Sequence, residues 1–113
     1  MKLPNGEKAL VEIAKLRDYC LSAAHPEGRH KARVFRAVLG IGPADSRILQ
    51  QQLQAAARDQ EAVAGEVDGF GHRYVIDFPL EHAGRRALVR SAWIALVNEN
   101  FPRLTSCYIL RGL

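Results

Sequence analysis

The chain has 113 residues, of which 48% are hydrophobic and 25% are charged. This composition excludes a disordered polymer and predicts a single domain over residues 1–113 with its own core. The formal net charge is +4, and residues 1–58 hold ten basic against five acidic side chains, whereas residues 59–113 hold six against seven. The basic excess of the first half favours an anionic partner such as RNA, or it solvates a helical surface.

Cysteine and histidine usage excludes several classes of site. Cys20 and Cys107 have no CxxC spacing, which predicts free, reduced thiols rather than a disulfide framework or a zinc site. No Cys or carboxylate stands at ligand spacing from the four histidines, so we expect no metal and no other cofactor. No apolar run is long enough for a signal peptide or a membrane span, which predicts a cytoplasmic protein without a membrane partner.

The first elements in chain order are predicted to be helices. Residues 4–6 (Pro-Asn-Gly) form a turn, after which Leu10, Ile13, Leu16 and Cys20 recur at helical spacing up to about residue 21. Residues 9–11 fit a short extended piece equally well. A second helix is expected over residues 29–39, where Pro26 and Gly28 precede it and Gly40 ends it. Its apolar stripe consists of Val34, Phe35, Val38 and Leu39.

A third helix is predicted to begin at Pro43, which suits the first position of a helix. Its three consecutive glutamines, residues 50–52, are expected to face outward, and the helix frays near residues 58–59. Its apolar stripe consists of Ile48, Leu49, Leu53, Ala56 and Ala57.

From residue 61 the hydrophobic period changes to that of strands. Residues 62–67 predict a weak strand, and residues 68–71 predict a turn whose two glycines take positive φ. Residues 73–78 predict a strong strand that Pro79 ends, residues 86–97 a long strand, and residues 104–110 the last one. His72 and His82 then fall in exposed hairpin loops. The order predicts an α+β fold, with N-terminal helices packed on one face of a four-stranded antiparallel meander sheet.

The start of the second helix concentrates cations. Arg29, Arg33 and Arg36 stand at i, i+4 and i+7, so a helix gathers them into a basic row that suits an RNA backbone. Lys31 instead precedes two residues of the apolar stripe, which indicates a cation that meets a partner or lines a cleft. His25 or His30 would supply an imidazole for acid–base catalysis, because imidazole titrates near neutral pH.

Alternation along the predicted strands places further polar groups. Asp77 and Arg90 pair across neighbouring strands if the register allows, either as a structural ion pair or with Arg90 free to hold a phosphate. Ser91 and Trp93 lie on the face opposite Arg90. Trp93 and Tyr74 either anchor the core or stack against the bases of an RNA.

The last strand carries two more candidates, Thr105 and Tyr108, which alternation places on opposite faces. Either would orient a scissile group. Together with the cations of the second helix, these polar side chains predict a cleft between the sheet surface and the start of that helix.

Six blocks of the sequence resemble the signature of an uncharacterised bacterial domain family. They are residues 5–9, 25–28, 31–35, 71–79, 89–94 and 102–108. That family occurs as small stand-alone proteins, often encoded beside a small β-barrel protein, and as C-terminal effector domains of filamentous-haemagglutinin-like polymorphic toxins. The chain departs from the family pattern at Phe70, where Tyr is expected, and at His72, where Gln is expected.

The resemblance implies a toxin-like effector, and the order of elements is similar to the barnase-like and RelE-like ribonuclease fold. Our leading interpretation of these residues is a metal-independent ribonuclease that acts through the 2′-hydroxyl, with Lys31 and Arg90 holding the phosphate. The small β-barrel neighbour is then a possible antitoxin. The matching polar positions are His25, Lys31, Tyr74, Asp77, Arg90, Trp93, Thr105 and Tyr108. The alternatives are a non-catalytic partner of an acidic protein and a plain RNA-binding module.

Overall fold

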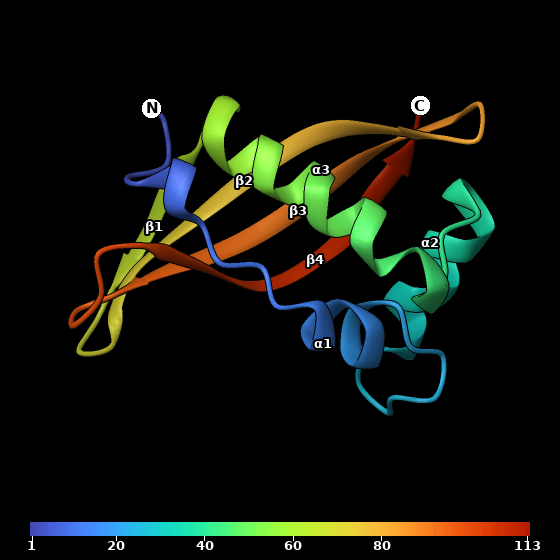
Figure 1. The fold of residues 1–113 in the computed structure, drawn as a ribbon, viewed down its shortest axis with the longest axis horizontal. Coiled ribbons are helices and arrows are strands. Elements are labelled where there is room, and N and C mark those ends of the chain that lie inside the picture. Colours follow the sequence, from blue (N-terminus) through green and yellow to red (C-terminus); the bar gives the residue numbers. More distant parts are fainter.

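Four antiparallel strands form one sheet in the order β1-β2-β3-β4, which confirms the predicted meander (Figure 1). The strands are β1 (Val63–Val67), β2 (Gly71–His82), β3 (Arg85–Leu96) and β4 (Pro102–Gly112). The computed structural model describes residues 1–113. All helices precede the strands, as an α+β fold with segregated elements requires.

Strand β2 continues through Pro79, so the prediction that this proline ends the strand is wrong. Pro79 stands opposite Leu88 of β3, and pairing of β2 with β1 reaches only as far as Val75. Beyond Val75 the β1 side of β2 is an open edge. A proline is accepted there because no neighbouring strand needs its missing N–H.

The first two hairpin turns of the sheet have different backbone conformations. Between β1 and β2, Asp68 accepts the backbone N–H of Phe70 at Oδ1 at 2.9 Å, and neither Gly69 nor Gly71 takes the positive φ predicted for them. Between β2 and β3, Ala83 (φ 52°) and Gly84 (φ 76°) are both left-handed, which is the conformation of a two-residue hairpin turn. His72 and His82 both belong to β2 and are half-buried, so the prediction that they lie exposed in hairpin loops is wrong.

Helix α2 (Arg29–Leu39) has the predicted bounds and ends at Gly40, whose φ of 67° is the left-handed conformation that favours glycine. Its buried side chains are Ala32, Phe35 and Leu39. Val34 is 40% exposed, so it does not belong to the apolar stripe as predicted. The buried stripe is rotated toward Ala32, whose small side chain lets the helix approach the core closely.

Helix α3 (Ser46–Asp59) follows a short 3₁₀ turn, Pro43–Asp45, and ends where fraying was predicted. Most of its predicted stripe is buried, but Ile48 is 41% exposed. Gln50 does not face outward as expected. Its Nε2 donates to the backbone oxygen of Val11 at 2.8 Å, which fixes the N-terminal segment against this helix.

Residues 9–11 are extended, so of the two predictions for them, the start of a helix or a short extended piece, the second is correct. Leu10 pairs in parallel with Arg103, and the Leu10 N–H donates to the Pro102 oxygen at 2.9 Å. A 3₁₀ turn, η1 (Gly6–Lys8), precedes this extended piece, and α1 (Ile13–Lys15) follows it and continues as the π-helical η2 (Leu16–Cys20).

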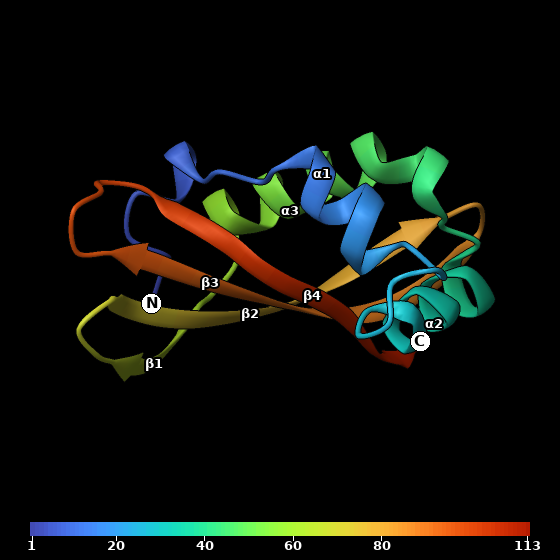
Figure 2. The same ribbon diagram turned by 90° about the horizontal axis from the view of Figure 1, so that it is seen from below.

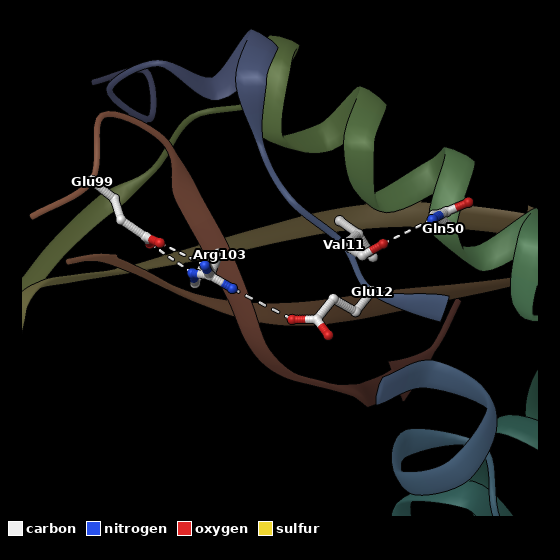
Figure 3. A network of polar contacts seen from close by, with 5 residues as sticks. All are labelled: Val11, Glu12, Gln50, Glu99 and Arg103. Atoms are coloured by element: carbon white, nitrogen blue, oxygen red, sulfur yellow. Dashed lines mark hydrogen bonds and ion pairs between the residues drawn. The ribbon is translucent and has the colours of Figure 1, made fainter. Parts of the chain in front are cut away.

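Arg103 also holds this segment through its side chain (Figure 3). Its Nε and Nη2 donate to both carboxylate oxygens of Glu99, and its Nη1 reaches Glu12 Oε1 at 3.5 Å. Glu99 is 17% exposed, so this ion pair is better shielded from solvent than the others of the molecule. The cluster joins the chain start to the loop before β4.

Helices cover one face of the sheet and leave the other uncovered. Figure 2 shows α1 and α3 on one side of the sheet and α2 beside the C-terminal half of β4, while no helix lies across the opposite side. The core lies between α3, η2 and the inward side chains of β2 to β4, including Ile76, Val89 and Trp93. None of the helices has the length and apolar composition needed to cross a lipid bilayer.

Candidate functional site

The uncovered sheet face carries a lateral row of polar side chains from three strands. Asp77 of β2 stands directly opposite Arg90 of β3, and Arg90 stands opposite Tyr108 of β4. Residues opposite each other in an antiparallel sheet point to the same face, so the three side chains are neighbours. Lys31 of α2 extends this set, and we call Lys31, Tyr108, Arg90 and Asp77 the outer-face row.

The Asp77 and Arg90 pair forms with two parallel hydrogen bonds, as the alternation predicted for a matching register. Arg90 Nε donates to Asp77 Oδ1 at 2.8 Å and Nη2 donates to Oδ2 at 2.9 Å. The two side chains are 39% and 34% exposed. The Arg90 guanidinium lowers the pKa of Asp77, with a smaller contribution from the charge of Arg111. The two hydrogen bonds that Arg90 donates to Asp77, and to a smaller extent the nearby Tyr108, raise the pKa of Arg90.

Lys31 reaches the row from outside the sheet. Its Nζ lies 3.2 Å from Ser106 Oγ, to which it donates, and 5.1 Å from the centre of the Tyr108 ring. The side chain is half-buried and forms no ion pair with a carboxylate. This agrees with the prediction of a cation that meets a partner at the start of α2. Its charge is solvated by a hydroxyl and an aromatic face, both of which leave it free to attract an anion.

A pocket of about 350 Å³ opens at the Asp77 end of the row. Its floor combines the apolar Val63 and Val75 with the polar Glu61, Asp77 and Arg90. Lys31 and Tyr108 do not line it, so the single cleft expected between the helix and the sheet is replaced by a row with a pocket at one end. A lining of apolar and charged side chains suits a flat polar group such as a nucleobase.

The two candidate histidines, His25 before α2 and His30 in its first turn, do not contact the row. His25 Nδ1 accepts the N–H groups of Glu27 and Gly28 at 3.1 and 3.2 Å, and its ring meets Tyr19 edge-on at 4.6 Å. These bonds shape the turn that leads into α2. His30 is exposed, and no hydrogen bond or aromatic contact joins it to another side chain.

Trp93 and Tyr74 are core anchors, which confirms one of the two interpretations of each. Trp93 is 1% exposed, and its Nε1 donates to Ser91 Oγ at 2.8 Å, which donates in turn to the Ile76 oxygen at 2.9 Å. Tyr74 is 6% exposed, and its hydroxyl bonds His72 Nδ1 at 3.0 Å. Neither ring presents a face on which a nucleobase could stack, so the base-stacking role expected for them is wrong.

Thr105 lies at a β-bulge. Ala92 pairs with Ser106 and Trp93 with Leu104, so Thr105 is the extra residue between them, and its hydroxyl donates to the Ala92 oxygen at 3.1 Å. The bulge interrupts the alternation by which Thr105 and Tyr108 were assigned to opposite faces. Ser106 instead presents its hydroxyl to Lys31. Sequence reasoning missed Ser106 because no local signal marks the bulge.

Helix α2 presents the predicted basic row to solvent. Arg29, Arg33 and Arg36 are exposed, and none of them forms an ion pair with a carboxylate. The helix contains no acidic residue. Its cations therefore remain available for a polyanion, and Lys31 connects this surface to the outer-face row.

The arrangement offers two cations, a phenol and an ionised carboxylate on one open face. A guanidinium and an ammonium stabilise the charge of a phosphate, and a phenol and a carboxylate are able to exchange protons with it. No group of three or more His, Cys, Asp and Glu side chains lies together as a possible metal site.

Comparison with known proteins identifies the family and adds no activity. No curated protein and no solved structure matches the chain. Residues 2–111 match a family described as a domain of unknown function (DUF6883). Because the match covers nearly the whole chain, the protein belongs to the DUF6883 family.

Proposed function

We propose that the protein is a toxin-like effector that cleaves RNA without a metal ion, at the outer-face row. The observation that carries the proposal is the position of Lys31, whose Nζ reaches across from a basic helix to Ser106 and the Tyr108 ring. A lysine without a carboxylate partner, next to an arginine on an open sheet face, favours a phosphate ligand over a structural role.

The reaction follows from the groups in the row. The 2′-hydroxyl of a ribose attacks the adjacent phosphorus, an O2′–P bond forms, and the bond from phosphorus to the 5′-oxygen breaks. Asp77 accepts the proton of the 2′-hydroxyl, and Tyr108 donates a proton to the leaving 5′-oxygen. The products are a 2′,3′-cyclic phosphate and a 5′-hydroxyl. Lys31 and Arg90 stabilise the negative charge of the phosphorane.

Substrate binding would improve Asp77 as a base. In the free protein the Arg90 guanidinium occupies both carboxylate oxygens and lowers the pKa of Asp77. A phosphate competes for the same planar fork, because guanidinium binds carboxylate and phosphate with similar geometry. Once Arg90 turns to the phosphate, the pKa of Asp77 rises and its proton affinity with it.

The basic row of α2 would bind the RNA backbone beside the cleavage site. Arg29, Arg33 and Arg36 are exposed and unpaired, so each is able to replace a counterion at a phosphate. In the toxin-like context, the small β-barrel protein encoded beside such domains is the proposed antitoxin.

Induction of the chain in bacteria, alone and with the neighbouring gene, tests this function. We expect growth arrest and fragmented total RNA with the chain alone, and relief when the neighbour is present. Lys31→Ala should remove both effects, whereas Lys8→Ala, an exposed lysine in the 3₁₀ turn Gly6–Lys8, should leave both unchanged. Normal growth and intact RNA under strong expression of the soluble wild-type chain would contradict the proposal.

A second function, RNA binding without cleavage, is favoured by the bidentate Asp77 and Arg90 pair, which keeps the arginine occupied in the free protein. It predicts salt-dependent RNA binding with intact RNA. Tyr108→Phe separates the two functions. Loss of the hydroxyl removes cleavage in the first case and leaves binding unchanged in the second, with Tyr74→Phe on the core face as the control.

A further inference from the structure

The two ends of the outer-face row differ in charge. Helix α2 carries four lysine or arginine side chains and no acidic residue. At the other end, residues 61–68, which include β1, contain three carboxylates and no lysine or arginine. Lys2 and Arg73 lie next to this segment, but they pair with Glu61 and Asp68. Figure 1 shows β1 and α2 at opposite ends of the molecule, so a polyanion that crosses the sheet is attracted toward α2 and repelled from β1.

The groups of the row follow one another in a fixed order between these ends. The pocket comes first, then Asp77, Arg90 and Tyr108 on successive strands, and Lys31 of α2 comes last. Neighbouring strands lie about 4.8 Å apart, so β2 and β4 leave about 10 Å between them, with Arg90 in the middle. A phosphate held by Arg90 then has the carboxylate on one side and the phenol on the other. In-line displacement at phosphorus needs its base and its acid on opposite sides.

We propose that the site takes single-stranded RNA in one direction, with the base on the 5′ side of the cleaved bond in the pocket and the 3′ nucleotides over α2. This inference rests on the proposed function, which assigns Asp77 to the 2′-hydroxyl and Tyr108 to the leaving 5′-oxygen. The ribose that supplies the 2′-hydroxyl therefore lies at the Asp77 end, where the pocket opens. The leaving nucleotide lies at the Tyr108 end, beside Lys31.

The pocket requires an unpaired base. Its volume is about 350 Å³, and Val63 and Val75 line it together with the charged groups of Glu61, Asp77 and Arg90. In a duplex the polar edge of a base is paired and both its faces are stacked, so a duplex base does not reach these groups. Val63 is 69% exposed in the free protein, and contact with the face of a base removes its apolar surface from water.

Chimeric oligonucleotides with one ribonucleotide in a deoxynucleotide strand test the direction, because only the ribonucleotide has an attacking 2′-hydroxyl. One strand extends only on the 3′ side of the ribonucleotide. The other, of equal length, extends on the 5′ side and keeps a single deoxynucleotide after the cut. With a mixture of the four bases at the ribonucleotide, we expect kcat/KM to be at least tenfold higher for the first strand. Equal cleavage, or a preference for the second strand, would overturn the proposal.

A variant of α2 shows whether this preference comes from the basic helix. Arg33→Ala should reduce cleavage of the 3′-extended strand and leave the 5′-extended strand unchanged, since only the first reaches α2. Arg47→Ala on α3, also exposed, should change neither. An equal loss for both strands in Arg33→Ala would contradict the path over α2.

A pair of valine variants tests the pocket. Val63→Ala removes apolar surface from the lining and should lower cleavage at least threefold. The same variant should have no effect on a strand whose ribonucleotide lacks its base. Val67→Ala is the matched control, because Val67 lies on the same strand, is 70% exposed and does not line the pocket. Equal effects of the two variants, or an effect that persists without the base, would remove the base from the pocket.

Photocrosslinking measures the direction without cleavage. Strands made only of deoxynucleotides carry 5-iodouracil at the 5′ end or at the 3′ end, and mass spectrometry identifies the crosslinked peptides. We expect the 5′ label on residues 61–75 and the 3′ label on α2. The reversed pattern would overturn the direction. The expected pattern with chimeric strands that stay intact would reject the proposed cleavage and support the direction of binding, so the two failures are distinguishable.

Discussion

Replacement of Ser91 with alanine tests which face of the sheet is buried, and therefore which face carries the site. Ser91 is completely buried between two partners, the indole N–H of Trp93 at 2.8 Å and the backbone oxygen of Ile76 at 2.9 Å. Alanine keeps the shape of the side chain apart from one oxygen. The indole N–H then has no acceptor in the core.

The magnitude follows from the unpaired donor. A buried polar group left without its hydrogen bond costs about 1–3 kcal/mol, whereas the Ile76 oxygen retains its place in the strand ladder. For a domain of this size each kcal/mol lowers Tm by about 5 °C, so Ser91→Ala should melt about 5–15 °C below the wild type. In a Trp93→Phe background the same substitution should cost less, because the unpaired N–H is already absent.

Thermal and urea unfolding, followed by circular dichroism, measure these differences. Ser106→Ala is the matched control, because it removes a hydroxyl from the same sheet at a half-buried position on the outer face. Its cost should stay below about 1 kcal/mol, since water replaces the lost partner of Lys31. An unchanged Tm for Ser91→Ala, or a larger drop for Ser106→Ala, would refute the assignment of the faces.

Three further predictions concern the row and the basic helix. Arg90→Lys should melt within a few degrees of the wild type, because the pair with Asp77 is exposed. Its rate of RNA cleavage should fall at least tenfold, because lysine lacks the planar fork of the guanidinium. Full activity of this variant would remove Arg90 from the site. Asp77 has a lowered pKa in the folded state, so its stabilising effect is present above its ordinary pKa and is lost as the pH falls through the folded value. Asp77→Asn should therefore flatten the dependence of stability on pH below about pH 4, and an unchanged acid titration of unfolding would contradict this. Arg33→Ala should reduce the salt dependence of RNA binding by about one counterion, whereas Arg47→Ala on α3, also exposed and unpaired, should leave it unchanged.

Sequence periodicity predicted the elements whose boundaries depend on local signals. Helix α2 has the predicted bounds because Gly28 and Gly40 flank a clear apolar period, and Gly40 takes the left-handed conformation that ends a helix. Short loops and local alternation also predicted the α+β order and the pairing of Asp77 with Arg90. The position of Lys31 followed from its conflict with the apolar stripe.

The remaining features depend on contacts between distant segments. Pro79 is accepted inside β2 because β1 is too short to pair alongside it, and the length of a neighbouring strand is not a local property. Because of the bulge at Thr105, Ser106 rather than Thr105 meets Lys31, and no glycine in the sequence marks the bulge.

Incubation of the purified chain with total RNA in excess chelator is the most direct test of metal-independent RNA cleavage. We expect fragments that end in 2′,3′-cyclic phosphate and 5′-hydroxyl groups, with cleavage undiminished by the chelator. Lys31→Ala, folded by its melting curve, should cleave at least a hundredfold more slowly. Intact RNA with the folded wild-type chain, cleavage that requires a divalent ion, or full activity of Lys31→Ala would contradict the account.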